Sequence, residues 1–182
     1  MRTVQIPKHI RKKGKQIPAL LIHPYLSNEP QNRYDYIIRL IIFTGLRPIE
    51  IQSAVFEDGF ITVKNAKQKA DKEPTYRRIP IHSALLPYIQ EIKKYLSINQ
   101  NNLAKYFKKH FPIEFRLYDL RHTFTSRIQE CGANKSWVDY VTNHTTAQNT
   151  TDRIYTHWSD EFQLQEIEKL NFSPKSVPKN SL

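Results

Sequence analysis

Apolar residues recur at a helical spacing along most of the chain. Between Asn28 and Gly45 they lie three to four residues apart; Asn28 can cap a helix, Pro30 suits a first turn and Gly45 can end it. This pattern predicts a core helix. Similar apolar stripes predict further helices in the short segment after Pro48, the segment after Ser83, the region around Leu103, the stretch from Tyr118 to Gly132, the stretch around Trp137 and Val141, and the stretch from Phe162 to Leu170.

Two segments have the composition of strands instead. Residues 60–63 and 76–81 are rich in β-branched and aromatic side chains, and a polar, lysine-rich stretch separates them. The dipeptide Asp58-Gly59 before the first segment is typical of a turn. The sequence therefore predicts a β-hairpin with a long tip. The expected fold class is mainly α with a small antiparallel β-sheet (α+β).

The length of 182 residues fits a single domain with its own hydrophobic core. We expect residues 1–17 to form a basic N-terminal arm or linker, although a solvated tail fits this segment equally well. Residues 18–171 then form the folded domain, and residues 172–182 a polar C-terminal tail. The single cysteine, Cys131, excludes an intramolecular disulfide framework.

The charge of the chain points to a polyanionic partner. Lysine and arginine number 28 against 17 acidic residues, a formal net charge of +11. On charge alone, nucleic acid and an acidic membrane both remain open. No apolar run approaches the roughly 20 residues that span a bilayer, and no signal peptide follows the basic start. We therefore expect a cytoplasmic protein with no membrane association.

Four scattered motifs carry candidate chemistry. They are Gly45-Leu46-Arg47-Pro48-Ile49-Glu50, then Lys67 just beyond a strand, then Tyr118-Asp119-Leu120-Arg121-His122-Thr123, and finally His144 followed by Ile154-Tyr155-Thr156-His157. Taken singly, each has an ordinary structural explanation, such as a surface arginine or a core tyrosine. The seven histidines are scattered, and the chain has neither a paired-cysteine pattern nor a glycine-rich phosphate loop, so we expect no metal and no nucleotide cofactor.

In this order the motifs resemble the catalytic domain of the tyrosine recombinases, the phage integrase family. The resemblance spans about residues 18 to 170, and its most specific parts are residues 119–124 and 155–157. It implies the tyrosine recombinase catalytic-domain architecture. It also implies an enzyme that cuts and rejoins double-stranded DNA in recombination or integration of a phage or another mobile element, without metal or ATP.

The resemblance assigns a role to each candidate residue. Tyr155 would attack the phosphorus and form a 3′-phosphotyrosyl link, while Arg47 and Arg121 would bind the phosphate, since a guanidinium group is planar and can bind two oxygens. Lys67 would protonate the departing 5′-oxygen, and His144 would donate to the phosphate or assist proton movement. Tyr118 occupies the remaining catalytic position.

Several neighbours of these residues have weaker assignments. Lys64 and Lys69 lie close enough in sequence to replace Lys67 as the proton donor. Glu50 lies three residues after Arg47, where its carboxylate can orient the guanidinium group without reacting. We interpret His122 and His157 as structural residues or weak DNA contacts.

The sequence departs from the family pattern at three places. Tyr118 stands where the family usually has histidine, which replaces an imidazole by a phenol whose ordinary pKa is near 10. Asn143 stands where glycine is common, and asparagine can adopt the left-handed conformation that glycine supplies. The segment 145–154 is about two residues longer than usual, a change that a loop absorbs at small entropic cost.

Three hypotheses follow. The leading one is the catalytic domain of a site-specific recombinase. The family resemblance implies a tetramer on DNA for a full-length protein and a monomer for an isolated domain. The alternative is a catalytically impaired, recombinase-derived DNA-binding module, motivated by Tyr118 and the longer loop. The third is an enzyme that only relaxes supercoiled DNA. Most family members carry a core-binding domain before the catalytic one, and both an excised piece and a natural truncation remain open for this chain.

Overall fold

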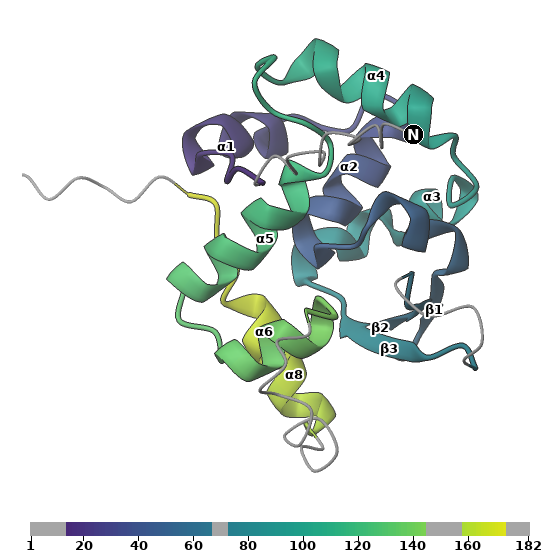
Figure 1. Cartoon of the computed structure of the whole chain (residues 1–182), viewed down its shortest axis with the longest axis vertical. Coiled ribbons are helices and arrows are strands. Elements are labelled where there is room, and N and C mark those ends of the chain that lie inside the picture. The colour runs from purple at the N-terminus through teal and green to yellow at the C-terminus, as the bar shows by residue number, and fades with distance from the viewer. Residues whose placement is uncertain (1–13, 67–72, 145–157, 174–182) are drawn as a thin grey trace, which may run out of the picture.

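The computed structural model describes residues 14–66, 73–144 and 158–173 (Figure 1). Its elements are mostly helices, with one small sheet on one side. The predicted fold class is confirmed. Within these described ranges, no helix is both long enough and apolar enough to cross a membrane.

The central helix, α2 (Arg33–Thr44), is buried along most of its length. It begins later than predicted, because Asn32 rather than Asn28 caps it: the Asn32 side chain accepts a hydrogen bond from the Tyr34 amide at 2.9 Å. A helix that the sequence analysis did not predict, α1 (Ala19–Ser27), precedes α2. Arg39 of α2 donates to carbonyl groups at the end of α1 and just beyond it, and so fixes α1 to α2.

The end of α2 lies where the sequence predicted it, at Gly45. This glycine has a φ of 63°, and its amide donates to the Ile41 carbonyl at 2.8 Å. A Cβ atom on Gly45 would lie only 2.4 Å from Cδ1 of the Phe124 ring. Two independent constraints therefore favour glycine here: the left-handed backbone and the close approach of an aromatic ring.

We expect Gly45→Ala to lower the free energy of unfolding by about 2–4 kcal/mol. An L-residue in the left-handed region costs about 1 kcal/mol, and overpacking against a buried ring adds roughly 1–3 kcal/mol. Gly132→Ala is the matched control, because Gly132 also has a positive φ, of 86°, but nothing lies within 4 Å of a Cβ placed there. Urea unfolding of both variants tests this prediction, and equal losses would contradict the steric part of the argument.

A short 3₁₀ helix, η1 (Pro48–Ser53), leads from α2 into the sheet, as the sequence predicted. The sheet has the strand order β1 (Val55–Glu57), β2 (Phe60–Lys64) and β3 (Tyr76–Pro80), with both pairings antiparallel. The predicted hairpin of β2 and β3 is thus confirmed, and β1 is an additional edge strand. Asp58 and Gly59, with φ values of 48° and 78°, form the turn between β1 and β2.

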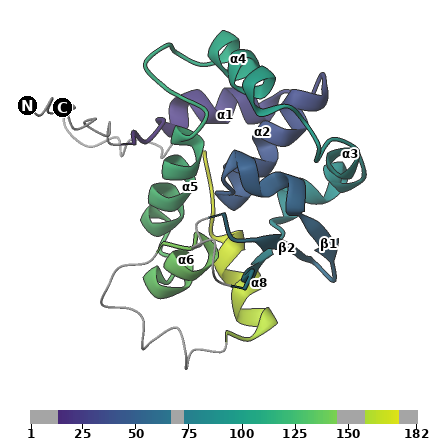
Figure 2. The same cartoon turned by 45° about the vertical axis from the view of Figure 1, so that its right-hand side comes forward.

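The remaining helices surround α2 and the sheet. They are the 3₁₀ helix η2 (Ser83–Tyr88), α3 (Ile89–Lys94), α4 (Gln100–His110), α5 (Asp119–Glu130), α6 (Lys135–Val141) and α8 (Asp160–Glu168). Helix α5 packs against α2 (Figure 2), and both α6 and α8 contact β3. The apolar core includes Ile17 and Phe172, which lie just outside the two predicted domain boundaries. The ends of α2, α5 and α6 meet beside the sheet, and this meeting point positions the candidate site.

Candidate active site

Arg47 lies at the start of η1, directly after the end of α2, and is buried. Its amide donates to Oε2 of Glu50 at 2.9 Å, and its Nη1 donates to Oε1 of the same carboxylate at 2.7 Å. Pro48 occupies the first position of the 3₁₀ turn, where its missing N–H costs nothing. The ion pair expected between Glu50 and Arg47 is therefore present, and it fixes the guanidinium group in one orientation.

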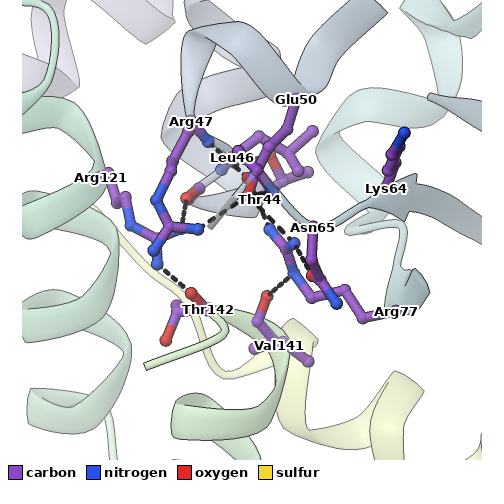
Figure 3. Close-up of polar contacts among 12 residues, drawn as sticks. Thr44, Leu46, Arg47, Glu50, Lys64, Asn65, Arg77, Arg121, Val141 and Thr142 are labelled. Atoms are coloured by element: carbon purple, nitrogen blue, oxygen red, sulfur yellow. Dashed lines mark hydrogen bonds and ion pairs between the residues drawn. The ribbon is translucent and has the colours of Figure 1, made fainter. Parts of the chain in front are cut away.

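Arg121 lies in the first turn of α5 and is also buried. Its Nη1 donates to the Gly45 carbonyl at 2.6 Å, and its Nη2 donates to the Thr142 carbonyl. Burial, and then the neighbouring charge of Arg47, lower the pKa of Arg121 to about 10. Figure 3 shows the two guanidinium groups reaching into the same region. At neutral pH Arg121 therefore remains charged, and its guanidinium group lies beside that of Arg47 in a site of restricted solvation.

This cluster has unused capacity to bind an anion. Nε of Arg47 is buried and has no hydrogen-bond partner among the described residues. Among the described residues of this cluster, the guanidinium groups of Arg47, Arg77 and Arg121 are all buried, whereas Glu50, which pairs with Arg47 and Arg77, is the one carboxylate labelled with them in Figure 3. Buried donors are nearly always satisfied, and buried charges are nearly always balanced. The arrangement therefore suits a bound anion with several oxygen atoms, such as a phosphate group.

His144 lies just beyond the end of α6, two residues after Thr142, whose carbonyl accepts from Arg121. Asn143 has a φ of 47°, and the amides of Asn143 and His144 donate to the carbonyls of Tyr140 and Asp139, at 3.0 and 2.9 Å. This is the helix-ending arrangement in which a left-handed residue lets the last carbonyls be satisfied. The prediction that asparagine can replace glycine here is confirmed. His144 follows directly and is exposed.

Tyr118 lies immediately before α5 and is 39% exposed. Its ring meets the ring of His122 edge-on, with centroids 5.6 Å apart, and it is an electrostatic neighbour of Arg121. The Asp119 carboxylate fixes this turn by accepting a hydrogen bond from the Arg116 amide at 2.8 Å. A phenol hydroxyl is therefore available at the same end of α5 as the buried arginine.

The structure places the candidate lysines and the candidate nucleophile less completely. Lys64 ends β2, is exposed, and points away from the arginine cluster (Figure 3). Lys67, Lys69, Tyr155 and His157 lie outside the described residues. Their assignments stay predictions.

Sequence reasoning missed one buried residue of the cluster, Arg77 in β3. Its guanidinium group pairs with Glu50, with Nη2 2.7 Å from Oε2. A signal was available, because side chains alternate along a strand and Arg77 shares its face with Ile79 and Ile81. An arginine on the apolar face of a strand implies a buried carboxylate partner.

The pH dependence of the free energy of unfolding should show the contribution of the ionised Glu50 carboxylate to stability. Burial alone would raise its pKa, but the hydrogen bonds and charge of Arg77, together with hydrogen bonds from Arg47, outweigh burial and lower the pKa from 4.5 to about 2. A lowered carboxyl pKa stabilises the fold above the unfolded-state value, and this stabilisation is lost as the pH falls toward the folded-state value.

We therefore expect Glu50→Gln to be less stable than the wild type at pH 7, and the difference to shrink by on the order of 3 kcal/mol between pH 5 and pH 2. Urea unfolding at a series of pH values measures this difference. If the free energies of unfolding of the two proteins changed with pH in parallel, the ion pairs of Glu50 would not stabilise the fold as we expect.

Comparisons with known proteins agree with one another. No family model matches the chain. Tyrosine recombinase XerA of Saccharolobus solfataricus is 26% identical over 185 residues, which cover 95% of this chain and 62% of that protein. XerA of Pyrococcus furiosus is 26% identical over 200 residues, which cover 94% of this chain and 66% of that protein. The chain thus spans less than two thirds of the length of these relatives.

Solved structures show the same fold at lower sequence identity. The integrase from mycobacterium phage Brujita superposes with a TM-score of 0.65 at 18% identity, covering 97% of this chain and 64% of that one. The Tn1549 transposon integrase, solved in complex with transposon right end DNA, gives a TM-score of 0.56 at 20% identity, covering 90% of this chain and 68% of that one.

Proposed function

We propose that this chain is a tyrosine recombinase catalytic domain that cuts and rejoins double-stranded DNA through a 3′-phosphotyrosyl intermediate, a proposal that its similarity to the two XerA recombinases and its fold support. The observation that supports this most strongly is the buried pair Arg47 and Arg121, with an unpartnered Nε on Arg47. Such a pair suits a phosphodiester that gains negative charge on its non-bridging oxygens as a nucleophile attacks. The DNA bound in the Tn1549 integrase structure supports the same class of partner.

In the proposed reaction, the Tyr155 hydroxyl attacks phosphorus, the new bond from the tyrosine oxygen to phosphorus forms, and the hydroxyl proton passes to solvent water. The bond from phosphorus to the 5′-oxygen breaks, and Lys67 supplies the proton that the departing oxygen needs. One phosphodiester is exchanged for another, so the step is nearly isoenergetic. Attack by a 5′-hydroxyl on the phosphotyrosine reverses it and rejoins a strand. No metal or nucleotide enters this chemistry.

His144 and Tyr118 have supporting roles in the proposal. Both belong to segments that adjoin Arg121: the Thr142 carbonyl just before His144 accepts from Arg121, and Tyr118 lies one turn before it. We propose that each donates a hydrogen bond to the phosphate. A phenol hydroxyl can donate such a hydrogen bond, so Tyr118 can position the phosphate in place of an imidazole.

Covalent trapping on nicked DNA tests the proposal without knowledge of the target sequence. The protein is incubated with a pool of duplexes of randomised sequence, each nicked a few nucleotides 3′ of the possible cleavage positions, so that the short product diffuses away. The buffer contains EDTA and no ATP. The proposal predicts an adduct that survives denaturing electrophoresis. Complete absence of an adduct, in a protein that still binds DNA, would contradict it and favour the impaired DNA-binding module.

A further inference from the structure

Arg77 is a buried charged residue of the arginine cluster to which the proposed chemistry gives no role. It is only 4% exposed, and its guanidinium group makes four hydrogen bonds to three other segments of the chain. Two of these bonds go to Glu50, one goes to the side chain of Asn65 at 2.5 Å, and one goes to the Val141 carbonyl at 2.8 Å. Few side chains connect so many parts of a site.

Each partner of Arg77 belongs to a different part of the candidate site (Figure 3). Glu50 orients Arg47. Val141 ends α6, and the next carbonyl, that of Thr142, accepts from Arg121. Arg77 and Arg121 thus satisfy consecutive carbonyl groups at the same helix end, where a cation is also favoured by the helix dipole. Arg77 therefore fixes β3 against the supports of both phosphate-binding arginines.

The third partner connects Arg77 to the hairpin segment that carries the candidate lysine. Asn65 follows β2, and its amide and side chain both donate to Thr75, each at 2.9 Å, closing the described base of the hairpin. The amide of Ala66 also donates to Oε1 of Glu50, at 3.4 Å. Lys67 is the next residue in the chain. The described backbone before Lys67 is therefore held by the carboxylate that orients Arg47.

From this geometry we propose that Arg77 is a positioning residue for the leaving-group proton donor: it holds the base of the lysine-bearing hairpin in register with the arginine pair. The inference rests on the proposed function, and specifically on Lys67 as the proton donor. A lysine could keep the charge of Arg77 but could not bond Glu50, Asn65 and Val141 together, because it lacks the planar fork of five donors.

A leaving group that needs no proton separates this role from a merely structural one. A 5′-bridging sulfur departs without a general acid, so DNA containing it should restore cleavage only when proton donation is the defect. We expect Arg77→Lys to slow cleavage of ordinary nicked DNA by about 100-fold, the effect of an error of about 1 Å in placement, and to cleave the 5′-thio substrate within about fivefold of the wild-type rate. Lys67→Ala should show the same pattern.

Arg78 offers the matched control. It is the next residue of β3, its side chain pairs with Asp160 at 3.0 Å, and both partners are nearly half exposed. We expect Arg78→Lys to change neither rate by more than about twofold. If Arg77→Lys does not fold, as judged by circular dichroism, Asn65→Ala removes one arm of the network and should show a smaller loss with the same sulfur rescue.

The outcomes are distinct. Equal losses on both substrates in a folded variant, or no loss on either, would overturn the role of Arg77. A wild-type protein that forms no adduct with either substrate would overturn the proposed function instead. If the wild type cleaves but sulfur does not rescue Lys67→Ala, the assignment of the proton donor is wrong, and the inference about Arg77 fails with it.

Discussion

Arg121→Ala should reduce the single-turnover rate of DNA cleavage by about a thousandfold or more while weakening DNA binding only modestly. Removing one donor to a developing oxyanion costs about 10²–10³ in rate, and losing a charged guanidinium group at a phosphoryl centre costs about 10³–10⁵. Arg121 combines both roles, because it is buried beside Arg47 and keeps its charge at neutral pH. Binding depends on many phosphate contacts over a basic surface and loses only one of them.

The variants Arg121→Lys and Arg33→Ala sharpen this test. Arg121→Lys keeps the charge but cannot bond both the Gly45 and Thr142 carbonyls as the guanidinium group does, so we expect a loss of about a hundredfold. Arg33 is exposed at the opposite end of α2, and Arg33→Ala removes the same charge at no cost to cleavage. A loss of less than about tenfold in folded Arg121→Ala would contradict the phosphate-binding role.

Tyr155→Phe is expected to abolish the covalent adduct altogether while leaving DNA affinity within about twofold of the wild type. The substitution removes one oxygen atom, and no other group can replace a nucleophile whose product is a tyrosyl phosphate. The phosphate-binding arginines are unchanged, so the affinity for DNA should persist. Denaturing electrophoresis measures the adduct, and fluorescence anisotropy at matched salt measures binding.

Tyr118→Phe is the control for this result. Tyr118 is the other tyrosine that we assign to the site, and it also loses only a hydroxyl. Because its proposed role is a hydrogen bond to the phosphate, Tyr118→Phe should slow adduct formation by about tenfold to a hundredfold without preventing it. An adduct that persists in Tyr155→Phe and disappears in Tyr118→Phe would reverse the two assignments.

Local patterns in the sequence predicted those parts of the fold that depend on local interactions. Helix α2 has an apolar stripe and ends at Gly45, whose left-handed backbone is a common way to end a helix. Asn143 could be predicted to adopt the same conformation. The ion pair of Arg47 with Glu50 was also predictable, because three residues separate them within a single turn.

The parts that sequence reasoning missed depend on contacts between distant segments. Helix α1 contains Pro24 and is stabilised at its end by Arg39 of α2. Strand β1 is three residues long and exists because it pairs with β2. Arg77 gained its importance from partners 12, 27 and 64 residues away in sequence. Neither periodicity nor composition encodes such contacts.

The central claim is that Tyr155 becomes covalently attached to DNA, and identifying the attached residue tests it most directly. The adduct formed on the nicked pool is digested with protease and nuclease, and the linked peptide is sequenced by tandem mass spectrometry. The proposed function predicts a peptide that carries a nucleotide 3′-phosphate on Tyr155. A nucleotide found on any other residue, Tyr118 included, would contradict it.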